Sequence, residues 1–396
     1  MVKKNSLVLA LILFSSFLFT VAPALAQNEY REWTFMVYMD ADNNLDLAGL
    51  DDVAEMQSVG SSANVAVVAL LDRWGEECGF DGSAVLYVHE GLNETLWGGW
   101  SYDYELNMGD PQTLTWFINY TVEAFPADKY ALILWDHGGN WEGICWDWTD
   151  DDYLTIEEVK EALENSIIGK VDLLGFDACL MASMEVAFTM ELSGKVGVMV
   201  ASEDSIPWDG WPYDIVLSNL VGTPTQNEYE LSIAIVDDYI ASYEEIGWSK
   251  VFTTLSSISL SRTNEVVSSL KALVSKLLAD FDVYKRSITH ARNQADRYWF
   301  GAWHQGPYID LFNFVHQLEA EETLMPYTAP ILDAWSSLVI HSKACSGPHN
   351  RGANGLTIYF PRNRNSFYTP EPYYESVPEL IEETNWNALL AASFES

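Results

Sequence analysis

Two residues suited to nucleophilic catalysis, Cys179 and His137, each follow a short apolar run of the sequence. A thiol becomes an effective nucleophile when a histidine within hydrogen-bonding reach takes its proton. The same histidine can then protonate the leaving group as a general acid. We therefore treat Cys179 as a candidate nucleophile and His137 as its acid–base partner in an acyl-transfer reaction.

The sequence around these residues predicts that both lie at one edge of a parallel sheet. Apolar runs bounded by glycine and aspartate are typical of buried parallel strands, which we expect at 131–135 and 171–179. The interval between them leaves room for one crossover connection. Residues 181–192 have helical spacing, so Cys179 is expected at a strand-to-helix junction, where the helix N-terminus favours the thiolate. Open α/β sheets bind ligands at this edge.

Glycines after the histidine suit close contact with a substrate. Gly138 and Gly139 let the backbone turn tightly around a substrate carbonyl and direct an N–H group towards it. We expect the N–H groups of Gly138 and Cys179 to stabilise the oxyanion that forms when a thiolate attacks a carbonyl carbon.

Two aspartates are candidates for the substrate-binding pocket. Asp177 lies two residues before Cys179 on the predicted strand, so both side chains point to the same side. Asp204 lies in the segment 202–213, which leaves the carboxyl end of a strand predicted at 196–201. A carboxylate in the pocket selects Arg or Lys through charge-assisted hydrogen bonds. The alternatives are that Asp177 only orients backbone and that Asp204 is solvated.

Five motifs, taken in order along the chain, resemble the clostripain family of cysteine peptidases. They are the segment 33–45, Asp136-His137-Gly138, Asp177-Ala178-Cys179, Gly210-Trp211-Pro212-Tyr213 and the segment 355–361. The family belongs to the caspase-like group with legumain, gingipain and separase. The resemblance implies a caspase-like three-layer α/β/α sandwich with a mostly parallel central sheet and a largely helical C-terminal half. It also implies a cysteine endopeptidase that acts on protein or peptide substrates through a His–Cys dyad and cleaves after Arg or Lys.

One property of the resembled family is not expected here. Clostripain relatives commonly cut themselves after a basic residue between the catalytic histidine and cysteine. In this chain that interval contains only Lys160 and Lys170 as basic residues, and both fall within predicted regular structure. We therefore expect the protein to remain a single chain.

Two other classes of protein fit part of the sequence. The 16 tryptophans are compatible with an exported carbohydrate-binding protein, although core packing is the ordinary reason for buried tryptophan. An inactive caspase-like scaffold is the second alternative, and the presence of both His137 and Cys179 argues against it. Reaction with a thiol-alkylating probe separates the enzyme from both alternatives.

The N-terminus predicts export. Residues 1–26 combine Lys3 and Lys4, an apolar run at 7–19 and the small-residue site 24–26, the pattern of a secretory signal peptide. We expect a secreted protein with no membrane attachment after signal cleavage.

Without Lys3 and Lys4, the chain has 58 acidic residues and 18 basic ones. This net charge of −40 excludes nucleic acid as a main partner. Attraction of cationic substrates and adaptation to salt or heat both remain explanations for this charge.

The mature chain shows one α/β core and an appended helical part. We expect the catalytic α/β core at 27–225 and a mostly helical region at 226–396 that completes the same peptidase unit. The helical region has periodic apolar patterns at 228–245, 262–281, 284–299, 307–318 and 326–340. A strand at 356–360 is expected to join the sheet or its edge.

An acidic loop between the two candidate catalytic residues suits a hard cation. Four of the six residues 147–152 are aspartates, and carboxylates are the ligands that Ca²⁺ prefers. The loop lacks EF-hand spacing, so Asp147, Asp150 and Asp152 form only a candidate calcium site, which calcium dependence in the resembled family favours. The alternative is an exposed acidic loop before a helix capped by Thr155. The peptidase chemistry itself requires no cofactor.

Overall fold

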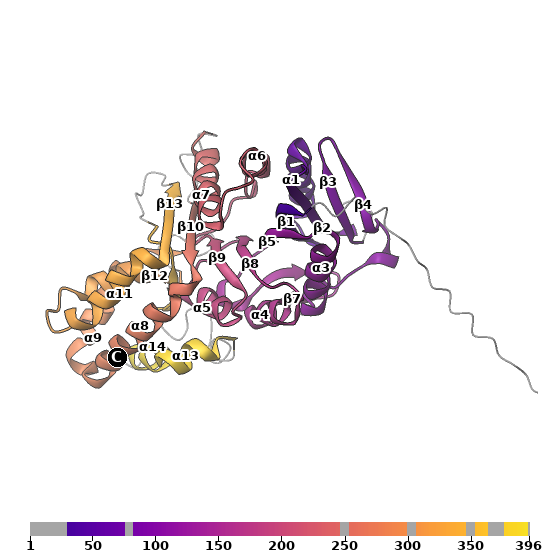
Figure 1. Cartoon of the computed structure of the whole chain (residues 1–396). Helices are drawn as coiled ribbons and strands as arrows, with labels where there is room; N and C mark the ends of the chain where they lie inside the picture. The colour runs from indigo at the N-terminus through magenta and orange to yellow at the C-terminus, as the bar shows by residue number, and fades with distance from the viewer. Residues whose placement is uncertain are drawn as a thin grey trace, which may run out of the picture.

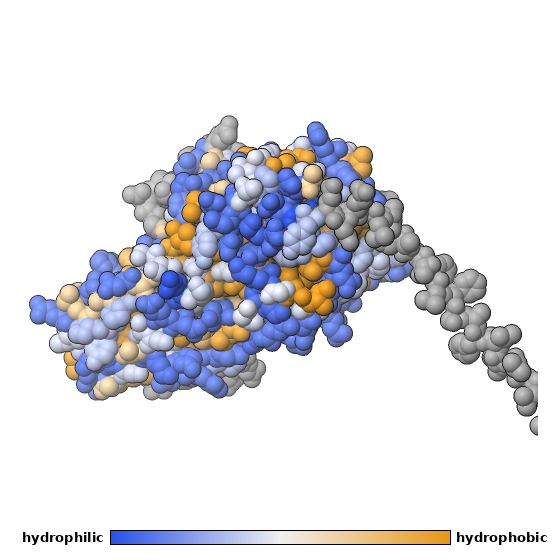
Figure 2. Space-filling view, viewed as in Figure 1, coloured by the Kyte–Doolittle hydropathy of each residue, from blue (hydrophilic) through white to orange (hydrophobic). Residues whose placement is uncertain are grey.

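The computed structural model describes residues 30–75, 82–245, 253–298, 306–345, 353–362 and 376–394. The predicted signal peptide at 1–26 therefore lies outside the described residues. No helix in these ranges combines the length and apolar character needed to cross a lipid bilayer. Hydrophilic residues cover most of the face shown in Figure 2, where apolar residues form separate patches between them.

A nine-stranded mixed sheet forms the centre of the protein (Figure 1). In spatial order its strands are β13 (Val339–Cys345), β10 (Thr253–Ser259), β9 (Val196–Ala201), β8 (Val171–Asp177), β5 (Ala127–Trp135), β1 (Arg31–Ala41), β2 (Val65–Arg73), β3 (Ala84–His89) and β4 (Leu92–Gly98). The five central strands, β9 to β2, run parallel, and the two strands at each edge are antiparallel. Every residue of β2 and β8 is buried, as expected for parallel strands covered on both faces.

Helices cover both faces of the sheet, which confirms the predicted three-layer fold. On one face lie α1 (Asp46–Val59), α6 (Tyr213–Gly222) and α7 (Glu228–Glu245); on the other lie α3 (Pro111–Ala124), α4 (Ile156–Asn165), α5 (Met184–Leu192) and α8 (Thr263–Ala279) (Figure 1). Alternate residues of β1 divide between the two cores. Phe35 and Val37 pack in one, and Met36 and Tyr38 pack in the other.

The C-terminal half contributes two sheet strands that the sequence did not predict. Strands β10 and β13 extend the parallel sheet at one edge. Both were missed because β10 is rich in serine and threonine and β13 has three consecutive polar residues at its centre, so neither shows apolar alternation. The remaining helices are α9 (Phe281–Gln294), α10 (Leu311–Leu318), α11 (Met325–Leu338), α13 (Pro378–Thr384) and α14 (Trp386–Phe394).

The strand predicted at 356–360 forms, but it does not join the central sheet. This strand, β14 (Thr357–Tyr359), pairs with β12 (Tyr308–Asp310) in a separate sheet that also contains β11 (Arg297–Tyr298). The backbone N–H of Thr357 donates to the carbonyl of Ala182 (3.0 Å), so β14 lies against the segment that follows Cys179. The sequence pattern shows a strand but not its partners, which here are strand β12 and the loop before α5.

Candidate active site

The structure brings His137 and Cys179 to one pocket. Strands β5 and β8 are adjacent and parallel, with Trp135 opposite Asp177, so the chain leaves both strands at the same edge. His137 and Cys179 follow directly and line a pocket of about 260 Å³. The loop after β9 supplies a further wall, which includes Ser205, Ile206, Pro207 and Trp208. The arrangement has the nucleophile and the acid–base group that acyl transfer requires.

The junction after the cysteine differs from the prediction. Strand β8 ends at Asp177, and helix α5 starts at Met184 with Ser183 as its cap, so Cys179 is not at a helix N-terminus. The chain turns at Leu180, whose φ is 69°. The side-chain amide of Asn140 donates to the carbonyl of Leu180 (2.8 Å) and supports this turn.

A raised pKa favours the neutral thiol of Cys179, contrary to the expected thiolate. Burial, together with the negative charge of Asp204, raises the pKa of Cys179 to about 12. The backbone N–H of Ile206 donates to Sγ (3.2 Å), which opposes the rise in pKa without overcoming it. Because desolvation penalises the charged form, the thiolate must form by transfer of the proton to a nearby base.

Asn44, which was not among the predicted site residues, contacts His137. The Nε2 atom of His137 lies 2.9 Å from the amide oxygen of Asn44. An amide oxygen can only accept, so this contact is a hydrogen bond in the tautomer that has its proton on Nε2, and that tautomer leaves Nδ1 as the free base. Burial lowers the pKa of His137 below its ordinary value, which keeps the imidazole neutral. The signal that could have revealed Asn44 is a polar residue just beyond β1, the strand next to β5.

A hydrogen-bond network fixes the backbone on either side of this contact. The side-chain amide of Asn43 donates to Oδ1 of Asp136 (2.8 Å) and to the carbonyl of Trp146 (3.0 Å). The N–H of Trp146 in turn donates to Oδ2 of Asp136. The neighbours of Asn44 and His137 are therefore tied to each other and to strand β6 (Ile144–Asp147).

Gly138 is required for the close approach of the segments that carry His137 and Cys179. A Cβ atom at this position would lie 2.3 Å from the carbonyl oxygen of Cys179. Gly138 pairs with Ile144, and the flanking N–H of Gly139 donates to the carbonyl of Gly143 (2.9 Å). The glycine that the sequence analysis selected for substrate contact thus also permits the packing of the His137 and Cys179 segments.

The two predicted specificity residues occupy different positions. Asp177 lines the pocket, where Oδ2 accepts from the N–H of Trp211 (3.1 Å) and the hydroxyl of Tyr213 (3.0 Å). Its Oδ1 atom is buried and accepts no hydrogen bond from the described residues. Burial raises the pKa of Asp177 to about 7. Asp204 is buried beside the pocket but is not one of its lining residues, and its Oδ1 accepts from the N–H of Ser205 (2.8 Å).

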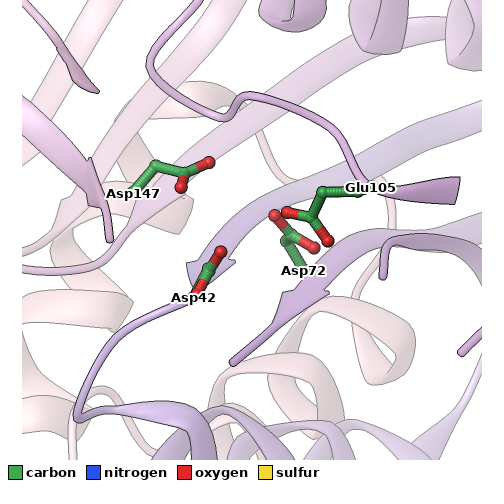
Figure 3. A group of neighbouring side chains, drawn as sticks. All are labelled: Asp42, Asp72, Glu105 and Asp147. Atoms are coloured by element: carbon green, nitrogen blue, oxygen red, sulfur yellow. The ribbon is translucent and has the colours of Figure 1, made fainter. Parts of the chain in front are cut away.

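A group of four carboxylates suits a hard cation, although it differs from the predicted set. Asp42, Asp72, Glu105 and Asp147 each place one carboxylate oxygen within 4.8 Å of the others (Figure 3). Of the predicted ligands only Asp147 belongs to this acidic cluster. The N–H of Asp150 donates to Asp147, and Asp152 accepts from the amide of Asn107.

The electrostatics of the acidic cluster favour either protons or a cation. Burial raises the pKa of Asp147 to about 7 and that of Asp72 well above its ordinary value, and the neighbouring carboxylates add to both shifts. The Oδ2 atom of Asp72 is buried and makes no hydrogen bond with the described residues. Oxygen-only ligands of this charge fit Ca²⁺ better than a softer metal.

Comparison with known proteins relates the chain to one family. Residues 37–392 match the family model described as the Clostripain family. The chain is 26% identical over 431 residues to clostripain of Hathewaya histolytica, in a match that covers 92% of this chain and 81% of that protein.

Two solved structures share the fold. One is a secreted C11 cysteine protease from Bacteroides thetaiotaomicron in complex with an irreversible peptide inhibitor. Its TM-score is 0.68 at 19% identity, over 90% of this chain and 100% of that one. The other is an inactive zymogen C11 protease from Parabacteroides distasonis. Its TM-score is 0.66 at 19% identity, over 90% of this chain and 98% of that one.

Proposed function

Because this chain belongs to the clostripain family of cysteine peptidases, we propose that it is a secreted endopeptidase that cleaves after Arg or Lys through His137 and Cys179. One observation carries the proposal. His137 and Cys179 leave neighbouring parallel strands and line a single pocket together with the buried carboxylate of Asp177.

The reaction proceeds through an acyl-enzyme. The Sγ atom of Cys179 attacks the scissile carbonyl carbon while His137 takes the thiol proton, and the C–N bond then breaks as His137 protonates the leaving amine. Water, activated by His137, hydrolyses the thioester. The N–H groups of Gly138 and Cys179 hold the oxyanion in both steps. Since thiol and imidazole are both neutral at rest, proton transfer accompanies attack instead of preceding substrate binding.

Asp177 provides the proposed selectivity for a basic residue. Its unpaired Oδ1 atom is buried, and a buried carboxylate is stabilised by a charged partner. The guanidinium of Arg or the ammonium of Lys supplies that partner when the substrate side chain enters the pocket. Asp204 does not line the pocket, so it affects the substrate only through its negative charge.

Substitution of the dyad tests the chemistry. Cys179→Ala and His137→Ala should each remove nearly all peptidase activity, while circular dichroism and the melting temperature stay close to the wild type. Cys345→Ala, which removes a different free cysteine, is the control and should remain active. Full activity in Cys179→Ala would refute the mechanism. Alkylation of Cys179 with loss of activity also separates the enzyme from a carbohydrate-binding protein or an inactive scaffold.

Calcium binding at the acidic cluster is the second part of the proposal. The four carboxylates fit a hard divalent cation, and Asp42 leads directly into Asn43 and Asn44. Asn43 holds the backbone around His137, and Asn44 contacts its imidazole. A cation that fixes Asp42 would therefore hold the histidine in place.

Export of the protein through cleavage after residue 26 completes the proposal. The pattern of residues 1–26 supports it. The similar protease from Bacteroides thetaiotaomicron is itself described as secreted. Mass spectrometry of the protein recovered from the culture medium should give an N-terminus at Gln27, and a protein that retains residues 1–26 in the cells would contradict export.

A further inference from the structure

A buried arginine outside the catalytic pocket has no counter-charge among the described residues. Arg292 lies on α9, and only 5% of its surface is exposed. Its Nε donates to the carbonyl of Phe360 (3.0 Å), and one terminal nitrogen donates to the side chain of Asn293 (3.1 Å). The other terminal nitrogen, Nη2, is buried and makes no hydrogen bond with any described residue. No described carboxylate forms an ion pair with Arg292 either.

Two other arginines lie near Arg292, in a protein whose overall charge is strongly negative. Burial, together with the positive charges of Arg297 and Arg362, lowers the pKa of Arg292 to about 9. The chain has only 20 basic residues against 58 acidic ones, so this concentration of arginine is unusual for its composition. A buried charge is costly unless it is paired, and a guanidinium is paired most effectively by an anion with two oxygens.

A cavity lies beside Arg292. The cavity has a volume of about 190 Å³, and its polar lining includes Arg292, Asn293 and Arg362. The hydroxyl of Thr289, also in the lining, donates to the carbonyl of Lys285 (2.8 Å), so its proton is not available. The hydroxyl of Ser393, which also lines the cavity, donates to the carbonyl of Leu389 (2.7 Å). Among the described side chains of the lining, the two guanidinium groups and the amide of Asn293 are therefore the donors with N–H groups to offer. None of its lining residues belongs to the catalytic pocket.

We propose that this cavity is a binding site for a small oxyanion, either inorganic phosphate or a free carboxylate. Arg292 donates from Nη2, and Arg362 adds a second positive charge from the exposed side of the cavity. The apolar ring of Phe360, whose centroid lies 5.8 Å from the guanidinium carbon of Arg292, limits the access of water. Weak hydration on this side strengthens a charge-assisted hydrogen bond to the anion.

Titration of the full-length Cys179→Ala protein tests the site without self-digestion. Thermal unfolding and isothermal calorimetry are measured with chelator present, in sodium phosphate, sodium acetate and sodium chloride at equal ionic strength. We expect saturable binding and a raised melting temperature with phosphate or acetate but not with chloride. A response to phosphate alone assigns a phosphate site, and a response to acetate as well assigns a carboxylate site.

Three variants identify the residues that bind the anion. Arg362→Gln removes an exposed side chain, so it should fold normally and weaken binding about tenfold, the effect of one lost charged hydrogen bond. Arg292→Lys keeps the charge but loses the planar fork, and it should weaken binding at least as much. Arg286→Gln, exposed on the same helix, is the matched control and should bind like the parent. Absence of saturable binding, or equal binding by all three variants, would overturn the proposal.

Discussion

At the scale of single residues, Asn44 decides which nitrogen of His137 acts as the base. Its amide oxygen accepts from Nε2, which leaves the lone pair of Nδ1 available. This contact requires no charge, unlike the aspartate of a serine-protease triad, so the pKa of the imidazole stays low. The pair Asn44–His137 therefore favours a neutral base that takes the thiol proton during attack.

Substitution of Asn44 should affect the chemical step more than binding. Asn44→Ala should lower kcat by about tenfold or more and change KM little. The loss is part of the rate enhancement of about 10²–10⁴-fold that a general base supplies. Asn44→Asp keeps the acceptor and adds a negative charge, so it should restore rate and move the acidic limb of the pH profile upward. An unchanged kcat in Asn44→Ala, with an unchanged pH profile, would show that the contact has no catalytic role.

Asp177 should control both substrate choice and its pH dependence. Asp177→Asn should cost ~2–5 kcal/mol in transition-state binding for Arg and Lys substrates and little for Ala or Leu substrates. Because the pKa of Asp177 is raised to about 7, its charge is present above that pH and is lost as the pH falls through it. The acidic limb of the profile of kcat/KM against pH should therefore lie near pH 7 for an Arg substrate. For a neutral substrate it should lie at a lower pH, because there the lowered pKa of His137 determines it.

Profiles of kcat/KM for matched peptides that differ only before the scissile bond test this prediction. In Asp177→Asn the two acidic limbs should coincide. Asp204→Asn is the control, because that carboxylate does not line the pocket. A wild-type enzyme that cuts after acidic or apolar residues and ignores Arg and Lys would show that the pocket has been misread, although the dyad would survive that result.

At the scale of elements, the ends of neighbouring strands build both proposed sites. Asp42 follows β1, Asp72 lies near the end of β2, and Asp147 ends β6. Glu105 comes from the segment after β4, beyond a short 3₁₀ turn. Their carboxylates point towards a common space in Figure 3. The turn that follows β1 therefore belongs to the acidic cluster through Asp42 and contacts His137 through Asn44.

Removal of calcium should lower both stability and activity. Binding to the native state alone raises the free energy of unfolding by about 2.7 kcal/mol when calcium is at 100 times its Kd. Chelation should lower the melting temperature and kcat, and added Ca²⁺ should restore both. Asp72→Asn should abolish this response, whereas Asp150→Asn, outside the acidic cluster, should retain it. If chelator changes neither quantity, the acidic cluster is held by protons and the loop after Asp147 is only a helix cap.

At the scale of the whole molecule, we expect the crossover between β5 and β8 to resist self-cleavage. Each of its two basic residues forms two ion pairs, but only Lys160 lies in regular structure, contrary to the prediction for Lys170. Lys160, on α4, pairs with Glu157 (2.6 Å) and Glu379 (3.0 Å). Lys170, directly before β8, pairs with Asp172 (2.8 Å) and Glu228 (2.9 Å). A peptidase binds its substrate in an extended form, which the helix at Lys160 cannot adopt without local unfolding. Lys170 lies in an exposed loop, where its two ion pairs oppose entry into the active site.

The active wild-type protein should therefore remain one chain between His137 and Cys179. A denaturing gel and intact-mass measurement of the wild type and of Cys179→Ala should show no fragment that ends in this interval. A fragment ending at Lys160 or Lys170 in the wild type but absent from Cys179→Ala would contradict the prediction. Such a result would show that the crossover unfolds locally often enough for the peptidase to cut it.

Local sequence determined the central strands and the identity of the dyad. The apolar runs at β5 and β8 are continuous because both faces of a parallel strand are buried, and this pattern survives any change of neighbours. Glycine and aspartate mark the ends of these runs, so the placement of His137 and Cys179 at one edge follows from sequence order. The helical spacing of α7 was equally local, and its predicted bounds match the structure.

Only the tertiary structure decided the surroundings of these residues. Strands β10 and β14 found their partners through long-range contacts, which a polar or short pattern does not specify. Asn44, Asp72 and Glu105 became site residues because distant strand ends meet at one edge, although each alone resembles an ordinary turn residue. The charge of Cys179 depended on burial, since desolvation by atoms far away in sequence outweighs any local helix effect. Sequence thus determined which groups carry the chemistry, and packing decided their protonation and their partners.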